Sequence, residues 1–83
     1  MAYYVYILVS EKTGRYYVGS SEDVHNRLER HNTGRVQATR YLRPLQIAYT
    51  EEPESRITAR RRELQLKRWK SRRVLDELIA KGV

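Results

Sequence analysis

Residues 3–9 are Tyr-Tyr-Val-Tyr-Ile-Leu-Val, and residues 15–19 are Arg-Tyr-Tyr-Val-Gly. Aromatic and β-branched side chains favour strands, so each run predicts a β-strand. The first run is apolar at odd and even positions alike, which indicates a central strand covered on both faces. A turn-rich loop over residues 10–14 joins the runs into an antiparallel hairpin, in which we expect Tyr6 and Tyr17 to lie near each other.

The hairpin is followed by a helix and a third strand. Residues 20–23 (Ser-Ser-Glu-Asp) combine a serine that can cap with acids that favour a helix N-terminus. This helix is expected to end near His31–Asn32. Residues 35–43 predict a polar, basic loop with little periodicity, and residues 45–50, which follow a proline, predict the third strand.

Two further helices are predicted in the C-terminal part. Residues 51–54 (Glu-Glu-Pro-Glu) suit the start of a helix. Ile57 and Leu64 are expected to face the core, with Ala59, Leu66 and Trp69 widening the buried side. Ser71 is expected to begin the last helix and Gly82 to end it. The order β-β-α-β-α-α predicts a small α/β sandwich, an α+β fold with a three-stranded antiparallel sheet flanked by helices.

The composition favours a polyanionic partner. The chain is expected to form one domain over residues 1–83, and its 17 Lys and Arg against 10 Asp and Glu give a formal net charge of +7. Between Arg56 and Arg73 there are nine basic residues and one acid, Glu63. Such charge predicts weak, salt-sensitive, sequence-independent binding of nucleic acid, whether or not the nucleic acid is cut.

Several other classes of protein are not expected. There is no cysteine, which excludes disulfides, zinc–thiolate sites and cysteine nucleophiles. No apolar run approaches the roughly 18 residues of a membrane span, so no membrane partner is expected. The N-terminus has neither a basic region nor a small-residue cleavage site, so we expect no secretory signal and a cytoplasmic protein.

Short motifs stand along the chain in a distinctive order. They are Tyr4-Val5-Tyr6, Tyr17-Val18-Gly19, Arg27, His31-Asn32-Thr33-Gly34, Arg43-Pro44 and the segment from Ala59 to Glu63. Their order and spacing resemble the GIY-YIG nuclease domain, in particular its small single-domain bacterial members, over nearly the whole chain. Two positions depart from the pattern of that family. Tyr4 replaces the glycine of the first motif, and Ser20 stands where some repair nucleases have a lysine.

The resemblance implies a catalytic site built from Tyr6, Tyr17, Arg27, His31 and Glu63. Glu63 would be the one protein ligand of a Mg²⁺ ion, for which Mn²⁺ can substitute, because magnesium keeps several waters and needs few carboxylates. Arg27 would hold the scissile phosphate and stabilise the developing charge. Tyr6, Tyr17 and His31 remain alternative general bases, and His31 follows Arg27 by one helical turn on the same face.

Other residues are assigned around this site. Gly19 is expected to allow close approach of backbone and substrate, and Asn32 to cap the helix or to line the site. Trp69 is expected to pack in the core. The basic residues expected to contact nucleic acid are Arg35, Arg40, Arg43 and Lys67.

Together these residues predict a metal-dependent endonuclease that hydrolyses phosphodiester bonds in DNA. So short a chain has no room for a separate DNA-binding module, so we expect a structured or single-stranded DNA substrate, as in DNA repair. The alternative is a nucleic-acid-binding module without catalysis, attached to a repair complex or associated with RNA or the ribosome. Sensitivity to a chelator separates the two hypotheses.

Overall fold

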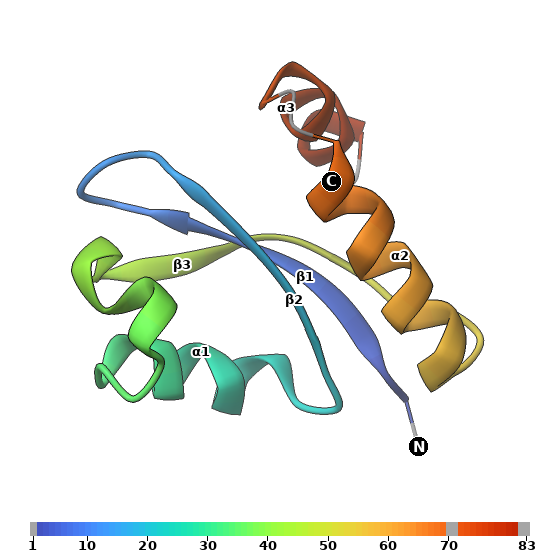
Figure 1. Ribbon diagram of the computed structural model, residues 1–83, viewed down its shortest axis with the longest axis horizontal. Coiled ribbons are helices and arrows are strands. Elements are labelled where there is room, and N and C mark those ends of the chain that lie inside the picture. Colours follow the sequence, from blue (N-terminus) through green and yellow to red (C-terminus); the bar gives the residue numbers. More distant parts are fainter. Residues whose placement is uncertain (1, 70–71, 82–83) are drawn as a thin grey trace.

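The computed structural model describes residues 2–69 and 72–81. Its elements are β1 (Tyr4–Ser10), β2 (Tyr16–Ser21), α1 (Val24–Asn32), the 3₁₀ helix η1 (Gln37–Leu42), β3 (Leu45–Glu51), α2 (Arg56–Arg68) and α3 (Arg72–Lys81). The three strands form one antiparallel sheet in the order β2-β1-β3. Figure 1 shows α1 on one side of this sheet and α2 on the other. The predicted fold class and element order are confirmed.

The central strand β1 determines which side chains meet. Residues 5–8 are all buried, as expected for a strand covered on both faces. Tyr6 pairs with Gly19, and Leu8 pairs with Tyr17. Paired residues of antiparallel strands project to the same side of a sheet, so Tyr6, Tyr17 and Gly19 share the face covered by α1. The predicted proximity of the two tyrosines is confirmed.

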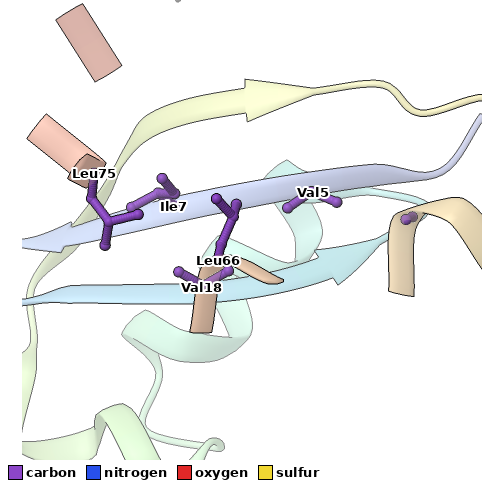
Figure 2. Close-up of a cluster of buried hydrophobic side chains, with 6 residues drawn as sticks. Val5, Ile7, Val18, Leu66 and Leu75 are labelled. Atoms are coloured by element: carbon purple, nitrogen blue, oxygen red, sulfur yellow. The ribbon is translucent and has the colours of Figure 1, made fainter. Parts of the chain in front are cut away.

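One core layer lies between the sheet and the two C-terminal helices. Val5, Ile7 and Val18 from the strands meet Leu66 of α2 and Leu75 of α3, as Figure 2 shows. Burying an aliphatic side chain of this size stabilises a fold by roughly 1.5–3 kcal/mol. This layer therefore holds α2, which carries Glu63, against the hairpin.

A second core layer lies beneath α1. It consists of Tyr6, Leu8, Val24 and Leu45, with the Tyr17 ring partly buried against it. Tyr6 is only 2% exposed, although its phenol is polar. A buried hydroxyl requires a hydrogen-bond partner, so the position of this phenol is closely defined by its neighbours.

The predicted start of the second helix at residues 51–54 is wrong. Glu51 belongs to β3, where it pairs with the central strand. The helix begins later, at Arg56, because Ser55 supplies the cap: its hydroxyl accepts a hydrogen bond from the Thr58 N–H at 3.2 Å. The acids before it form the connection from the sheet rather than the first helical turn.

The predicted inward side of this helix is confirmed for Ala59 and Leu66 and wrong for Ile57 and Leu64. Ile57 and Leu64 are 67% and 56% exposed, whereas Ala59 and Leu66 are buried. Both pairs have the seven-residue spacing of one helical face, but they lie on nearly opposite sides of the helix. The alanine side packs on the sheet because its small side chain permits close approach. Trp69 packs against the same core layer, as expected.

Three smaller features differ from expectation or cannot be compared with it. Asp23, rather than a serine, caps α1, which begins at Val24, and its carboxylate accepts a hydrogen bond from the Asn26 N–H at 3.0 Å. The loop expected to be irregular contains η1. The boundaries expected at Ser71 and Gly82 lie outside the described residues.

Within the described part, no helix is long and apolar enough to cross a bilayer.

Candidate active site

The Tyr6 ring fills the space above the glycine opposite it. A Cβ atom at position 19 would lie 2.6 Å from the Cζ carbon of Tyr6, far inside normal contact. Gly19 is therefore the residue that allows a buried aromatic ring to cross β2 at this point.

His31 of α1 contacts both tyrosines of the hairpin. It is 1% exposed, and its Nε2 atom lies 3.3 Å from the Tyr6 hydroxyl. Its ring meets that of Tyr17 edge-on, with 5.0 Å between the ring centroids. Burial lowers the pKa of His31, and the positive charges of Arg27 and Arg30 lower it further. The neutral imidazole, which can accept a proton, is thus the favoured form near neutral pH.

Arg27 acts on the Tyr6 phenol from the preceding turn of the same helix. Burial raises the pKa of Tyr6, and a hydrogen bond and the positive charge of Arg27 counteract part of this rise. The charges of Tyr17 and Glu63 also influence this phenol. Four of the five residues predicted to be catalytic are therefore electrostatically coupled, and His31 joins them through its contact with Tyr6.

Glu63 reaches the site from α2, on the opposite face of the sheet. Its Oε1 atom accepts a hydrogen bond from the Ser20 hydroxyl at 2.5 Å, and its Oε2 atom lies 2.6 Å from the Lys67 ammonium. Burial by itself raises the pKa of Glu63, but the hydrogen bonds from Lys67 and Ser20 outweigh it, and the net pKa is lowered. The carboxylate is therefore charged at neutral pH.

The donor set determines which metal these residues fit. Across residues 2–69 and 72–81, no three His, Cys, Asp or Glu side chains are arranged to hold an ion, so no protein cage is present in that part. A single charged carboxylate suits Mg²⁺, which keeps several waters and takes few protein ligands besides substrate phosphate. Lys67 blocks one oxygen of Glu63, but its side chain is 45% exposed and can move aside. The residues fit a hydrated divalent ion bound beside a phosphate.

A polar depression of about 220 Å³ connects Arg27 with the region of Glu63. The residues that line it are Tyr3, Ser20, Ser21, Glu22, Arg27 and Arg56. Ser20 lines this depression and also donates its hydrogen bond to Glu63. The guanidinium and the carboxylate thus flank one serine, at the edge of the sheet where its two faces meet.

Arg56 is a residue of this depression that the sequence interpretation missed. Its guanidinium lies 5.6 Å from the centroid of the Tyr3 ring. Its sequence position could have indicated it, because Arg56 precedes Glu63 by seven residues, or two helical turns, and so lies on the same helix face. Arg56 and Lys67 bring positive charge to the surroundings of Ser20, the position at which some members of the resembled family carry a lysine.

Asn32 makes its contacts with the sheet. Its side-chain amide donates to the Leu45 carbonyl at 2.9 Å and accepts from the Leu45 N–H at 2.7 Å. The side chain thus imitates a neighbouring strand and ties the end of α1 to β3. Because both of its polar atoms are engaged, Asn32 is not free to bind a substrate.

The predicted phosphate contacts after α1 are held by local hydrogen bonds. Arg40 donates from Nε to the Gly34 carbonyl at 3.1 Å, and Arg43 donates from Nε to the Arg40 carbonyl at 2.9 Å. Both side chains and that of Arg35 are exposed. These bonds fix two guanidinium groups through their inner nitrogens and leave their outer nitrogens available for an anion.

A larger depression on the α1 face has unsuitable chemistry for the same ligand. It measures about 600 Å³ and is lined by Tyr4, Val24, Ile47 and the acids Glu22 and Asp23, together with a histidine and a threonine. Neither lysine nor arginine lines it, so a phosphate would meet repulsion there. The smaller depression beside Ser20 is the better candidate.

We expect Gly19→Ala to destabilise the protein and to displace the Tyr6 ring. The new methyl group overlaps a buried ring, so the free energy of unfolding should fall by about 1–3 kcal/mol, as for other overpacked sites. Urea denaturation measures this change. Gln46→Ala, at an exposed position of β3, is the control and should have little effect. An unaltered urea midpoint for Gly19→Ala would contradict the proposed close packing.

Similar proteins match this chain over most of its length. Residues 2–76 match the family model described as the GIY-YIG catalytic domain. A UPF0213 protein of Staphylococcus saprophyticus is 33% identical over 81 residues, which cover 96% of each chain. A UPF0213 protein of Staphylococcus aureus is 35% identical over 80 residues, covering 92% of this chain and 96% of the relative.

A solved structure has the same fold. The solution NMR structure of the UPF0213 protein BH0048 from Bacillus halodurans is similar with a TM-score of 0.61 and 34% sequence identity. The similarity covers 99% of this chain and 87% of the other. The hairpin, α1 and α2 all lie within the matched region, so the likeness includes every element that contributes to the candidate site.

Proposed function

This chain belongs to the GIY-YIG catalytic domain family, whose fold implies nuclease activity, and from that premise we propose a divalent-metal-dependent endonuclease of DNA. The observation that carries the proposal is that Arg27 and Glu63 flank Ser20 while both act on the Tyr6 phenol. A guanidinium and a carboxylate on opposite sides of the molecule would have been incompatible with it.

Each side chain has a defined task in phosphodiester hydrolysis. Arg27 binds the scissile phosphate through two N–H groups and stabilises the charge that develops on its oxygens. Glu63 binds the divalent ion, which, when present, supplies Lewis-acid stabilisation of the phosphate and the leaving oxygen. Lys67 leaves Glu63 and turns to the substrate phosphates, since its side chain is largely at the surface.

Tyr6 is the best placed of the three candidate bases. Both Arg27 and Glu63 influence the pKa of its hydroxyl, so it is coupled to the two charges that would frame a phosphate. His31 faces Tyr6 with one ring nitrogen and Thr39 with the other. The imidazole therefore contacts the Tyr6 phenol rather than the substrate. The Tyr17 ring packs against it edge-on.

The exposed side chains of η1 favour a substrate with unpaired bases. Tyr41 is 82% exposed, which is unusual for a large aromatic residue, and it directly follows Arg40. Aromatic faces stack on unpaired bases, while neighbouring guanidinium groups bind the adjacent phosphates. Together with Arg43, these residues suit a single-stranded or branched DNA better than a regular duplex.

We expect Tyr41→Ala to weaken binding to single-stranded DNA while leaving duplex binding nearly unchanged. Loss of one stacked base costs about 1–3 kcal/mol. Fluorescence anisotropy at one fixed salt concentration, with EDTA present to prevent cleavage, measures both affinities. Tyr41→Trp keeps an aromatic face and should retain the affinity. Equal losses for single-stranded and duplex DNA would contradict a stacking role for Tyr41.

A cleavage panel tests the proposed activity directly. Single-stranded, duplex, flap and branched DNA, and RNA of matched sequence, are incubated with the protein in Mg²⁺, Mn²⁺ or EDTA. We expect cutting of the single-stranded or branched DNA with either metal and none in EDTA. Failure to cut any substrate with either metal would refute the endonuclease, and cutting in EDTA would refute the metal requirement.

A second candidate function is a nucleic-acid-binding module without catalysis. One observation favours it: both oxygens of the proposed metal ligand, Glu63, are engaged by Ser20 and Lys67. Such a module would keep its full biological function in the presence of a chelator. Displacement of Lys67 by added Mn²⁺, visible as paramagnetic broadening of its NMR signals, would instead support the enzyme.

A further inference from the structure

Two of the buried polar side chains in this protein are bonded to each other beside the candidate site. Among residues 2–69 and 72–81, the buried polar or charged side chains are Ser10, His31 and Thr39. Ser10 serves the hairpin loop and accepts hydrogen bonds from the backbone N–H groups of Lys12 and Thr13. The hydroxyl of Thr39, which is fully buried in η1, lies 2.7 Å from Nδ1 of His31.

The hydrogen bonds around His31 form a chain whose two ends have fixed roles. At one end is Arg27, whose guanidinium can only donate and acts on the Tyr6 oxygen. At the other end is the backbone carbonyl of Val36, which can only accept and lies 3.4 Å from the Thr39 hydroxyl. Between them stand the Tyr6–His31 contact of 3.3 Å and the His31–Thr39 contact of 2.7 Å.

These fixed ends favour one direction for every hydrogen bond. The positive charge of Arg27 acts on the Tyr6 oxygen and favours a Tyr6 hydroxyl proton that points away from it, toward Nε2 of His31. Nδ1–H of His31 then donates to the Thr39 oxygen, and the Thr39 hydroxyl donates to Val36. The opposite imidazole tautomer would turn the Tyr6 hydroxyl proton away from His31 and would break the bond to Val36.

We propose that Thr39 is a positioning residue that holds His31 as the Nδ1–H tautomer, with the lone pair of Nε2 aimed at the Tyr6 hydroxyl. The orientation comes mainly from Thr39, because its contact with His31 is much shorter than the contact of Tyr6. The catalytic consequence rests on the proposed nuclease function, whereas the tautomer itself does not.

In the nuclease this tautomer completes a proton path. The attacking water gives one proton to the Tyr6 oxygen while the Tyr6 hydroxyl proton passes to Nε2 of His31. The resulting hydroxide forms a bond to phosphorus, and the phosphorus bond to the leaving oxygen breaks. The leaving oxygen then takes up a proton from solvent, and His31 returns its extra proton to solvent, so that protons balance.

The tautomer can be observed without any nuclease substrate. The chain contains two histidines, His25 and His31, and the first is exposed on α1. Long-range ¹H–¹⁵N correlation spectra of uniformly ¹⁵N-labelled protein, at a pH where imidazole is neutral, distinguish protonated from unprotonated ring nitrogens. We expect His31 to show a protonated Nδ1 and an unprotonated Nε2, while His25 shows the average typical of a solvent-exposed ring. A protonated Nε2 in His31 of the parent protein would overturn the proposal.

Two variants separate positioning from packing. Thr39→Val keeps the volume and shape but removes the hydroxyl, so His31 should shift toward the Nε2–H tautomer, whereas Thr39→Ser should preserve the parent spectrum. In the cleavage assay, Thr39→Val should lower kcat by about 10- to 100-fold, the size of effect seen when a partner that orients a metal-bound histidine is removed, with KM unchanged. Thr39→Ser should restore most of this loss.

Failure of this inference is distinguishable from failure of the proposed function. The expected parent spectrum without cleavage of any substrate would refute the nuclease and leave the role of Thr39 toward His31 standing. An unchanged His31 spectrum in folded Thr39→Val would refute that role even if the protein cuts DNA. If Thr39→Val does not fold, the parent spectrum and Thr39→Ser still decide the question.

Discussion

Glu63→Gln is expected to abolish metal-dependent cleavage while the domain stays folded. Glutamine has nearly the same shape but no charge, so the ion loses its protein ligand and the several kcal/mol of charge stabilisation that accompany it. Because each 1.36 kcal/mol is a factor of ten, the rate should fall by about 10³-fold or more. Initial rates of single-strand cleavage over a Mg²⁺ titration measure the effect.

The same substitution should change stability only slightly. The pair that it breaks, Glu63 with Lys67, is an i,i+4 contact with a partly exposed lysine, and such pairs contribute about 0.3–0.5 kcal/mol. Glu77→Gln is a matched control, since Glu77 pairs with Arg73 at the same spacing on α3 but is well exposed. Cleavage at the parental rate by folded Glu63→Gln would remove Glu63 from the site.

The hairpin and its tyrosines could be predicted because the information lies within a few residues of sequence. Side chains alternate between the two faces of a strand, and a short loop makes the two runs antiparallel neighbours, so Tyr6 and Tyr17 could be expected near each other. The register that pairs Tyr6 with Gly19 comes from the structure. The spacing of Arg27 and His31 on one helix is equally local. These parts of the candidate site therefore agreed with the arrangement that the sequence indicated.

The orientation of α2 could be predicted only in part, because its sequence placed Ile57 and Leu64 on the same buried side as Ala59 and Leu66. Ile57 and Leu64 form a more hydrophobic pair than Ala59 and Leu66, yet the second pair is buried. Ala59 faces the sheet because its small side chain lets α2 pack closely on β1 and β2. A hydrophobic pattern does not indicate how closely a helix will pack on a sheet, and that distance decides which side chains fit between them.

Long-range contacts explain the site residues that the sequence did not indicate. Ser20 and Glu63 are hydrogen-bonded although 43 positions separate them in the chain. The sequence around either residue does not indicate this contact. Thr39 is a single threonine in a basic segment, and its buried contact with His31 depends on how η1 folds back onto α1. Arg56 was hidden among many arginines. Side chains of these common types become informative only when a fold brings them together.

Arg27→Ala is expected to lower the cleavage rate by about 10³-fold or more, the range observed when an arginine that stabilises phosphoryl transfer is removed. The substitution removes the donor to the phosphate and also a positive charge that lowers the pKa of His31, the final proton acceptor behind Tyr6. Without that charge, the pKa of His31 rises. The rise of activity with pH, which reports the neutral imidazole, should move to higher pH in the variant.

Two comparisons separate charge from geometry at this position. Arg27→Lys keeps the positive charge but lacks the planar fork, so it should restore the pH profile toward that of the parent while recovering only part of the rate. Arg30→Ala removes an exposed arginine from the same helix, whose charge lowers the pKa of His31 less than that of Arg27 does. It should leave the rate nearly unchanged and shift the pH profile less than Arg27→Ala does. If Arg27→Lys were as active as the parent, a point charge would suffice and bidentate binding of the phosphate would be wrong. If Arg27→Ala lost rate without any shift of its pH profile, the guanidinium would act on the phosphate alone, and His31 would lose its assignment as the proton acceptor behind Tyr6.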